Sequence, residues 1–132
     1  MITVVNVHGL TPNQPGVEYV GRAFGGWDPS PLGNPFKIGL DGTREECLLK
    51  YRVHLWNAYR TGQAEAAARS FVDTRPRSRE EDIYFAIGRL AARHVLGDDI
   101  VLGCWCAPKA CHAETIRAIV EWLGERLRGY GF

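Results

Sequence analysis

Three of the four cysteines and one of the four histidines fall within nine consecutive positions near the end of the chain. They are Cys104, Cys106, Cys111 and His112. Thiolate sulfur and imidazole nitrogen both bind zinc, and three Cys with one His is a recognised structural zinc set. The spacing C-x-C-x4-C-H differs from the two separated pairs of common zinc sites. Because of the residue types, and despite this spacing, one interpretation of the segment is a metal site formed by these four residues, with zinc as the cofactor.

The same residues allow two other interpretations. Thiols near a helix N-terminus and near basic groups are nucleophilic, which makes Cys106, Cys111 and His112 candidate catalytic residues. Alternatively, the segment forms the polar floor of a ligand site, where Cys104 is chosen for burial and His112 donates a hydrogen bond. All three interpretations remain open at this point.

The segment lies between a predicted strand and a predicted helix. The apolar run before it predicts a buried strand over 99–105, and Trp105, which alternates with the cysteines, is expected to pack against a helix. Apolar residues after it recur at intervals of three and four, as on one face of a helix, namely Ile116, Ile119, Val120, Leu123 and Leu127. Ligands bind at such turns in open α/β sheets, because the helix N-terminus presents unpaired N–H groups.

The stretch from 9 to 42 is a second candidate for binding. It contains eight of the 15 Gly and five of the seven Pro, which predicts a long loop, and loops of this length in compact domains are commonly functional. Arg22, Trp27 and Asn34 would supply a cation for phosphate, a stacking face and an amide for a base edge. Arg44 and Lys109 are further cations expected to contact the ligand. The alternative is a glycine-rich surface loop in which Asn34 merely begins a turn.

The remaining patterns predict a small α/β sandwich. β-branched and apolar residues indicate strands at 2–8 and 17–20. Capping boxes at 43–46 and 78–81 predict one helix to about 61 and another to the stop at 97, and a short helix is expected at 64–72. This order predicts a single α/β domain over 1–132, with helices packed on a short sheet whose strand order the sequence does not determine.

Composition narrows the class of protein. The chain has 132 residues, a net charge of +1 and 45% apolar residues, which suits one domain with its own core. There is no apolar run of membrane-spanning length and the N-terminus lacks signal-peptide features, so we expect a cytoplasmic protein that does not enter a membrane. In that compartment the cysteines are expected to be thiols, metal ligands or catalysts. The oligomeric state is not determined by the sequence.

Four motifs spread over nearly the whole chain carry a resemblance. They are Val-Gly-Arg at 20–22, Leu-Gly-Asn-Pro-Phe at 32–36, Asp-Gly-Thr-Arg-Glu-Glu at 41–46 with Tyr51, and Leu-Gly-Cys-Trp-Cys at 102–106 with Pro108 and Cys111-His112. Together they resemble the family catalogued as domain of unknown function 4326, small proteins of phages and bacteria, which names no activity. The last motif is also similar to domain of unknown function 488, in which Glu stands at the place of Cys106.

These patterns lead to one hypothesis and one alternative. The hypothesis is a phage-related α/β enzyme or binder that acts on a nucleotide, nucleoside or nucleic-acid base between loop 21–36 and turn 104–112. Arg22 and Asn34 would hold the ligand, while Cys106 and His112 would supply polar or acid–base groups. The alternative is a module without enzymatic activity that is stabilised by zinc or iron and binds a partner.

Overall fold

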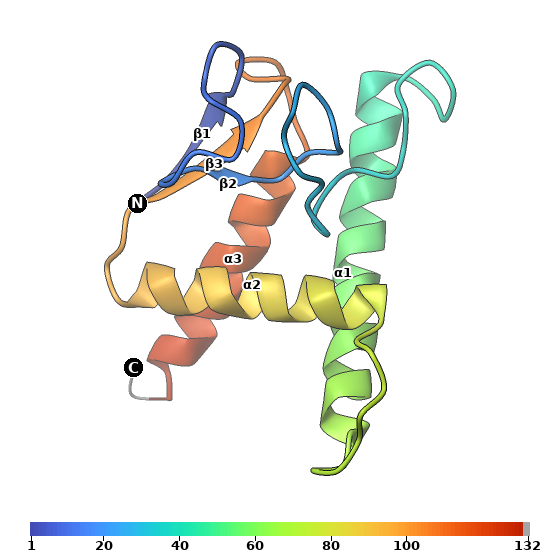
Figure 1. Cartoon of the computed structure of the whole chain (residues 1–132), viewed down its shortest axis with the longest axis vertical. Helices are drawn as coiled ribbons and strands as arrows, with labels where there is room; N and C mark the ends of the chain where they lie inside the picture. The colour runs from blue at the N-terminus through green and yellow to red at the C-terminus, as the bar shows by residue number, and fades with distance from the viewer. Residues whose placement is uncertain (131–132) are drawn as a thin grey trace.

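The computed structural model describes residues 1–130, which form a small α/β domain (Figure 1). The elements in this part of the chain are β1 (Ile2–Asn6), β2 (Glu18–Tyr19), α1 (Arg44–Ala68), α2 (Arg79–Val95), β3 (Ile100–Cys104) and α3 (Ala113–Arg128). The three strands are parallel in the order β1-β3-β2. The predicted fold class, helices on a short sheet, is confirmed.

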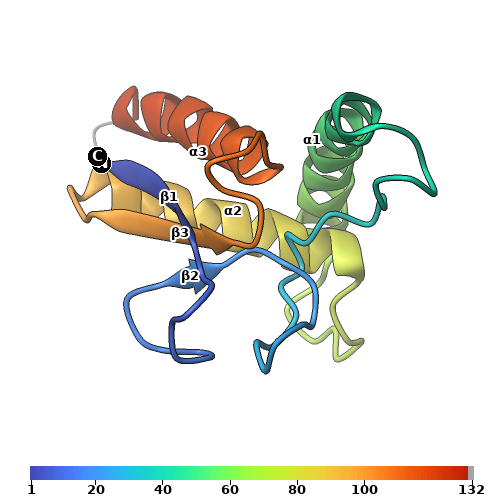
Figure 2. The same ribbon diagram turned by 90° about the horizontal axis from the view of Figure 1, so that it is seen from above.

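β3 lies at the centre of the sheet because it pairs on both sides. Its residues are apolar and mostly buried, as expected for a central parallel strand. In the register with β1, Ile2 lies opposite Ile100 and Asn6 lies opposite Cys104, so the carboxyl ends of the two strands meet. Figure 2 shows α3 on one side of the strands and the loop between β1 and β2 on the other.

The region from 44 to 72 differs from the prediction of two helices. α1 continues unbroken to Ala68, and Gly62 is the point where it meets the start of α2: a Cβ at Gly62 would lie 2.0 Å from the carbonyl oxygen of Glu80. Residues 69–72 are not helical. Arg69 is extended at the helix end, and its side chain pairs with the buried Glu81 of α2. The close contact between α1 and α2 thus explains why a glycine stands within the helix at this position.

Both predicted capping boxes are confirmed. The Thr43 side chain accepts from the Glu46 N–H, and the Glu46 carboxylate accepts from the Thr43 N–H. Ser78 and Glu81 form the same pair of bonds at the start of α2. The predicted stop of this helix is also confirmed, since Gly97 takes the left-handed conformation with φ +90° two residues after Val95.

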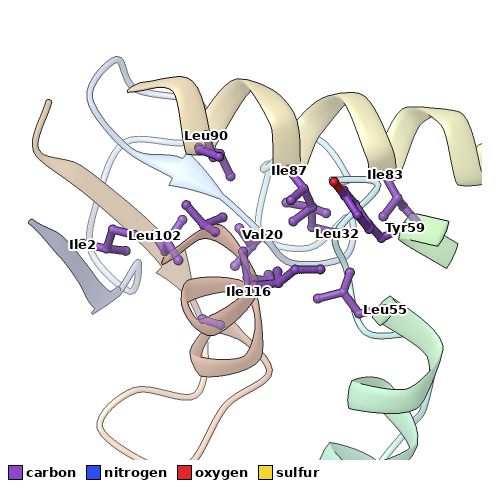
Figure 3. Packing of buried hydrophobic residues seen from close by; sticks show 14 of the residues in the cluster. Ile2, Val20, Leu32, Leu55, Tyr59, Ile83, Ile87, Leu90, Leu102 and Ile116 are labelled. Atoms are coloured by element: carbon purple, nitrogen blue, oxygen red, sulfur yellow. The ribbon is translucent and has the colours of Figure 1, made fainter. Parts of the chain in front are cut away.

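The main core lies between the sheet and the helices (Figure 3). α2 contributes much of it and crosses both α1 and α3, as Figure 1 shows. Loop residues complete this core, since Val20 and Leu32 are fully buried among the helices and strands. None of the helices within residues 1–130 combines the length and apolar character needed to cross a membrane.

A second, smaller core lies on the other side of the sheet, and Trp105 belongs to it. Val7, Tyr19 and Trp27 form its buried part, and Trp105 packs against them. The indole N–H of Trp105 donates to the Tyr19 hydroxyl at 2.9 Å. The expectation that Trp105 packs against a helix was wrong, because the face opposite Cys104 is covered by the β1–β2 loop.

Candidate functional site

A pocket of about 440 Å³ lies between the loop after β2 and the turn between β3 and α3. Its volume is within the range of about 300–1,000 Å³ that is common for small-molecule sites. The lining includes six residues expected from the sequence at a site, namely Arg22, Asn34, Arg44, Cys106, Cys111 and His112. The tertiary structure therefore places both predicted segments around one hollow.

Asn6 holds the turn between β3 and α3, and sequence reasoning missed it. Its side-chain amide donates to the carbonyl oxygens of Trp105, at 3.1 Å, and Ala107, at 2.8 Å. Its Oδ1 accepts the N–H of His8 at 2.8 Å. A polar residue at the carboxyl end of a strand could have indicated that Asn6 helps to form the site, because ligands bind at that edge of a parallel sheet.

His112 is a positioning residue in this geometry. Its Nε2 lies 2.5 Å from the carbonyl oxygen of Val20, and its Nδ1 lies 3.4 Å from the Cys111 sulfur. Burial lowers the pKa of the His112 imidazole, so the ring is neutral at neutral pH. Because a carbonyl only accepts, Nε2 carries the proton and Nδ1 is the acceptor. Both nitrogens are thus engaged within the protein, and the ring ties the turn to the loop after β2.

Tyr51 of α1 supports the opposite wall of the pocket. Its hydroxyl donates to the carbonyl oxygen of Leu32 at 2.6 Å, and both residues are fully buried. Burial raises the pKa of Tyr51, so the hydroxyl keeps its proton. The Tyr51 ring also meets the His112 ring edge to face, with centroids 5.0 Å apart. One helix residue therefore contacts both segments that enclose the pocket.

Asn34 and Arg44 each use part of their side chain for structure. The Asn34 Oδ1 accepts the N–H of Phe36 at 2.9 Å, which shapes the loop and leaves the amide NH₂ free to donate. Arg44, at the start of α1, donates to the carbonyl oxygen of Ala110 at 3.0 Å. Arg44 thereby connects α1 to the turn between β3 and α3.

The pocket lining carries positive charge without compensation. Arg22, Lys37 and Arg44 line it, and no Asp or Glu does. Within residues 1–130 the Arg22 side chain has neither a hydrogen-bond partner nor an ion-pair partner, and it is exposed. An unpaired guanidinium at a pocket wall can bind phosphate or carboxylate through two parallel hydrogen bonds.

Cys104 and Cys111 form a buried pair behind the pocket. The hydrogen bond from Cys111, followed by the N–H groups of Ala107 and Cys106, lowers the pKa of Cys104 to about 6. The shared hydrogen bond and burial raise the pKa of Cys111. The Cys111 sulfur also lies 3.4 Å from Nδ1 of His112. Cys106, by contrast, is half-buried and lines the pocket itself.

The four Cys and His residues of the turn do not fit a metal ion. Among residues 1–130 no three His, Cys, Asp or Glu side chains are arranged to hold one. One contribution is that Nε2 of His112 is already hydrogen-bonded to the carbonyl oxygen of Val20. The donor set that the spacing suggested for zinc or iron does not converge on one point.

Trp27 and Lys109 do not line this pocket, although both were expected to contact the ligand. Trp27 is only 3% exposed and stacks on Tyr19, with ring centroids 5.0 Å apart. Lys109 is exposed on the turn between β3 and α3. The aromatic residues that line the pocket are instead Phe36 and Trp105. Phe36 directly follows the Asn34-Pro35 turn, which is the signal that could have identified it.

Comparison with known proteins identifies a family. The model of the family described as Domain of unknown function (DUF4326) matches residues 5–122 of the chain. All residues that line the pocket fall within this match. The chain has no match among the curated proteins and none among the solved structures.

Proposed function

We propose that this chain, which belongs to the family described as Domain of unknown function (DUF4326), binds a nucleotide or nucleoside in the pocket between loop 21–36 and turn 104–112. The family description names no activity, so the pocket carries the proposal. The observation that supports it is a lining with three cations, a carboxamide and two aromatic residues but no carboxylate. Phosphate, a base edge and a base face need these three kinds of group.

In this proposal the cations bind phosphate and the uncharged residues bind the base. Arg22 and Lys37 are exposed and bind phosphate in this proposal, because their charged groups are not used by the protein within residues 1–130. The amide NH₂ of Asn34 donates to an acceptor on the base, while Phe36 contacts the base through its ring.

Cys106 is the cysteine that contacts the ligand in this proposal. The other three cysteines are at most 5% exposed, whereas Cys106 is half-buried at the pocket wall. His112 keeps the turn in place through Val20 and so acts on the ligand indirectly. Any chemistry on the bound base or sugar would accordingly begin at Cys106 rather than at His112.

Calorimetric titration with nucleosides and with their 5′-mono-, di- and triphosphates tests the proposal. We expect phosphorylated ligands to bind more tightly than nucleosides, and Arg22→Gln to weaken them by about 10- to 100-fold, the loss of one charge-assisted contact. Arg117→Gln is the matched control, since Arg117 lies on α3 outside the pocket. Unchanged affinity in the Arg22→Gln protein, or no binding of any of these ligands, would refute the site.

A second variant separates the base contact from the loop structure. Asn34→Asp keeps the oxygen that accepts from Phe36 but replaces the NH₂ donor with a carboxylate oxygen. We expect the fold to be retained and both nucleoside and nucleotide binding to be lost. Asn34→Asp with wild-type affinity for nucleosides would show that this amide does not contact the base.

A further inference from the structure

A larger hollow of about 1020 Å³ adjoins the proposed nucleotide pocket. The two share Arg22 and Asn34 as a common wall. The larger hollow extends from the loop over 22–35 to the N-terminal half of α2, and Figure 2 shows this loop beside that end of the helix. Its volume alone is at the upper end of the range of about 300–1,000 Å³ for small-molecule pockets.

The lining of this hollow is strongly basic. It contains one carboxylate, Asp82, and four arginines, namely Arg22, Arg77, Arg79 and Arg89. We call this hollow the arginine cleft. This is an uneven distribution for a chain with 16 basic and 15 acidic residues. Concentrated charge of one sign in a concave surface raises the local concentration of ligands of the opposite sign.

Three of the four guanidinium groups are not neutralised by an acidic partner. Arg89 forms a bidentate ion pair with Glu18, at 2.8 and 3.2 Å. Within residues 1–130, Arg22 and Arg79 have no ion-pair partner, and Arg77 lies over the Phe85 ring at 4.1 Å instead. The arginine cleft therefore keeps an excess of positive charge.

Arg77 and Phe85 lie together at this cleft, with the guanidinium carbon over the ring. Phe85 is exposed and lines the hollow together with Arg77. Guanidinium planes and aromatic rings are the two kinds of side chain on which unpaired bases stack. A duplex hides its base faces within the stack, so this surface suits a single strand.

We propose that the arginine cleft binds the phosphates next to the nucleotide in the pocket, so that the ligand is a single-stranded nucleic acid. This inference rests on the proposed function and specifies its substrate class. Arg22, in the wall between the two hollows, contacts the phosphate that joins the bound nucleotide to its neighbour. Arg77 and Arg79 bind the phosphates that follow.

The test uses a fluorescein-labelled single strand of mixed sequence, as DNA and as RNA, and the same sequence as a duplex. About 12 nucleotides suffice, since single-strand sites on small domains cover about 4–16. Affinities are measured by anisotropy over a range of salt concentrations for the wild type, Arg79→Gln and Arg77→Gln/Arg79→Gln. Arg117→Gln/Arg128→Gln is the matched control, because it removes the same charge from α3 outside both hollows.

We expect the single strand to bind more tightly than a mononucleotide and to lose about 100-fold in affinity or more in the double variant at low salt, since each charge-assisted contact is worth about 10-fold or more. The slope of log K against log salt should fall in magnitude by about 1.4, since each single-strand phosphate contact contributes about 0.7. The comparison of DNA and RNA shows which strand is the ligand. Mononucleotide affinity, which depends on Arg22, should remain unchanged in the double variant.

Four results would overturn the inference without affecting the proposed function. They are an equal loss in the α3 control, a single strand that binds no more tightly than a mononucleotide, a duplex that binds as well as the single strand, and a nucleoside triphosphate that loses as much as the strand. The last would show that the cleft holds terminal phosphates. If mononucleotides do not bind at all, the proposed function itself fails.

Discussion

The hydroxyl of Tyr51 is the single group whose removal tests most directly how the pocket wall is held. Tyr51→Phe deletes only this oxygen and keeps the ring that packs against His112. The hydroxyl donates to the Leu32 carbonyl at 2.6 Å in a place that water does not reach. The variant therefore leaves a buried acceptor without a donor.

The expected loss follows from that burial. A buried polar group left without its partner costs about 1–3 kcal/mol, and the full burial of both residues puts this pair toward the middle of the range, at about 2 kcal/mol. A second effect concerns the ligand. The loop that follows Leu32 carries Asn34 and Phe36 into the pocket, so its release should also weaken nucleotide binding.

Urea unfolding followed by tryptophan fluorescence measures the free energy of unfolding, and calorimetry measures ligand affinity. Tyr59→Phe is the matched control: Tyr59 is buried on the same helix, and its hydroxyl makes no hydrogen bond within residues 1–130. We expect the control to stay within about 0.5 kcal/mol of the wild type. If Tyr51→Phe destabilises no more than Tyr59→Phe, the wall is not held by this bond and the reasoning is wrong.

Three further predictions concern packing, reactivity and pH. Gly62→Ala should destabilise the fold by more than about 2 kcal/mol, because the new Cβ would meet the backbone of Glu80 at 2.0 Å. Gly88→Ala is the control: its Cβ would have nothing within 4 Å, so this variant should stabilise the helix by about 0.5–1 kcal/mol. Urea midpoints measure both effects. Iodoacetamide at neutral pH should label only Cys106 in the folded protein, as detected by mass spectrometry, because the other three cysteines are buried. Bound nucleotide should slow the labelling of Cys106, since this residue lines the pocket. Labelling of another cysteine before unfolding would contradict the burial of that cysteine. The salt bridge and hydrogen bonds of Glu81 hold its pKa at about 2, below the ordinary 4.5, so its contribution to stability is full above pH 4.5 and is lost as the pH falls toward 2. Glu81→Gln should flatten the acid side of the stability profile, and an unchanged profile would show that this pair does not contribute.

The sequence predicted which segments lie around the pocket better than it predicted the contacts that their residues make. Six expected residues line one pocket, because a glycine-rich loop and a strand-to-helix turn carry recognisable local signals. The function of His112 was not predictable, since its partner Val20 is 92 positions away. Trp27 was expected at the ligand, but the loop folds its ring onto Tyr19.

Local chemistry explains which elements could be derived without a structure. The two capping boxes set the starts of α1 and α2, because an N-cap bond joins residues only three apart. The break expected between residues 61 and 64 was wrong: α1 is continuous there, and Gly62 lets the start of α2 approach it closely. A local pattern cannot distinguish a glycine that ends a helix from one that lets a second helix approach.

By itself the sequence determined the α/β class and the starts of α1 and α2, since these depend on residue patterns and bonds between near neighbours in the chain. It also singled out two segments that the tertiary structure then brings around one pocket. Only the tertiary structure decided the order β1-β3-β2, the bonds of Asn6 to the turn and the arginine cleft along α2. These features join residues that are far apart in the chain. Their free energy comes from contacts that exist only once the sheet and helices have packed together.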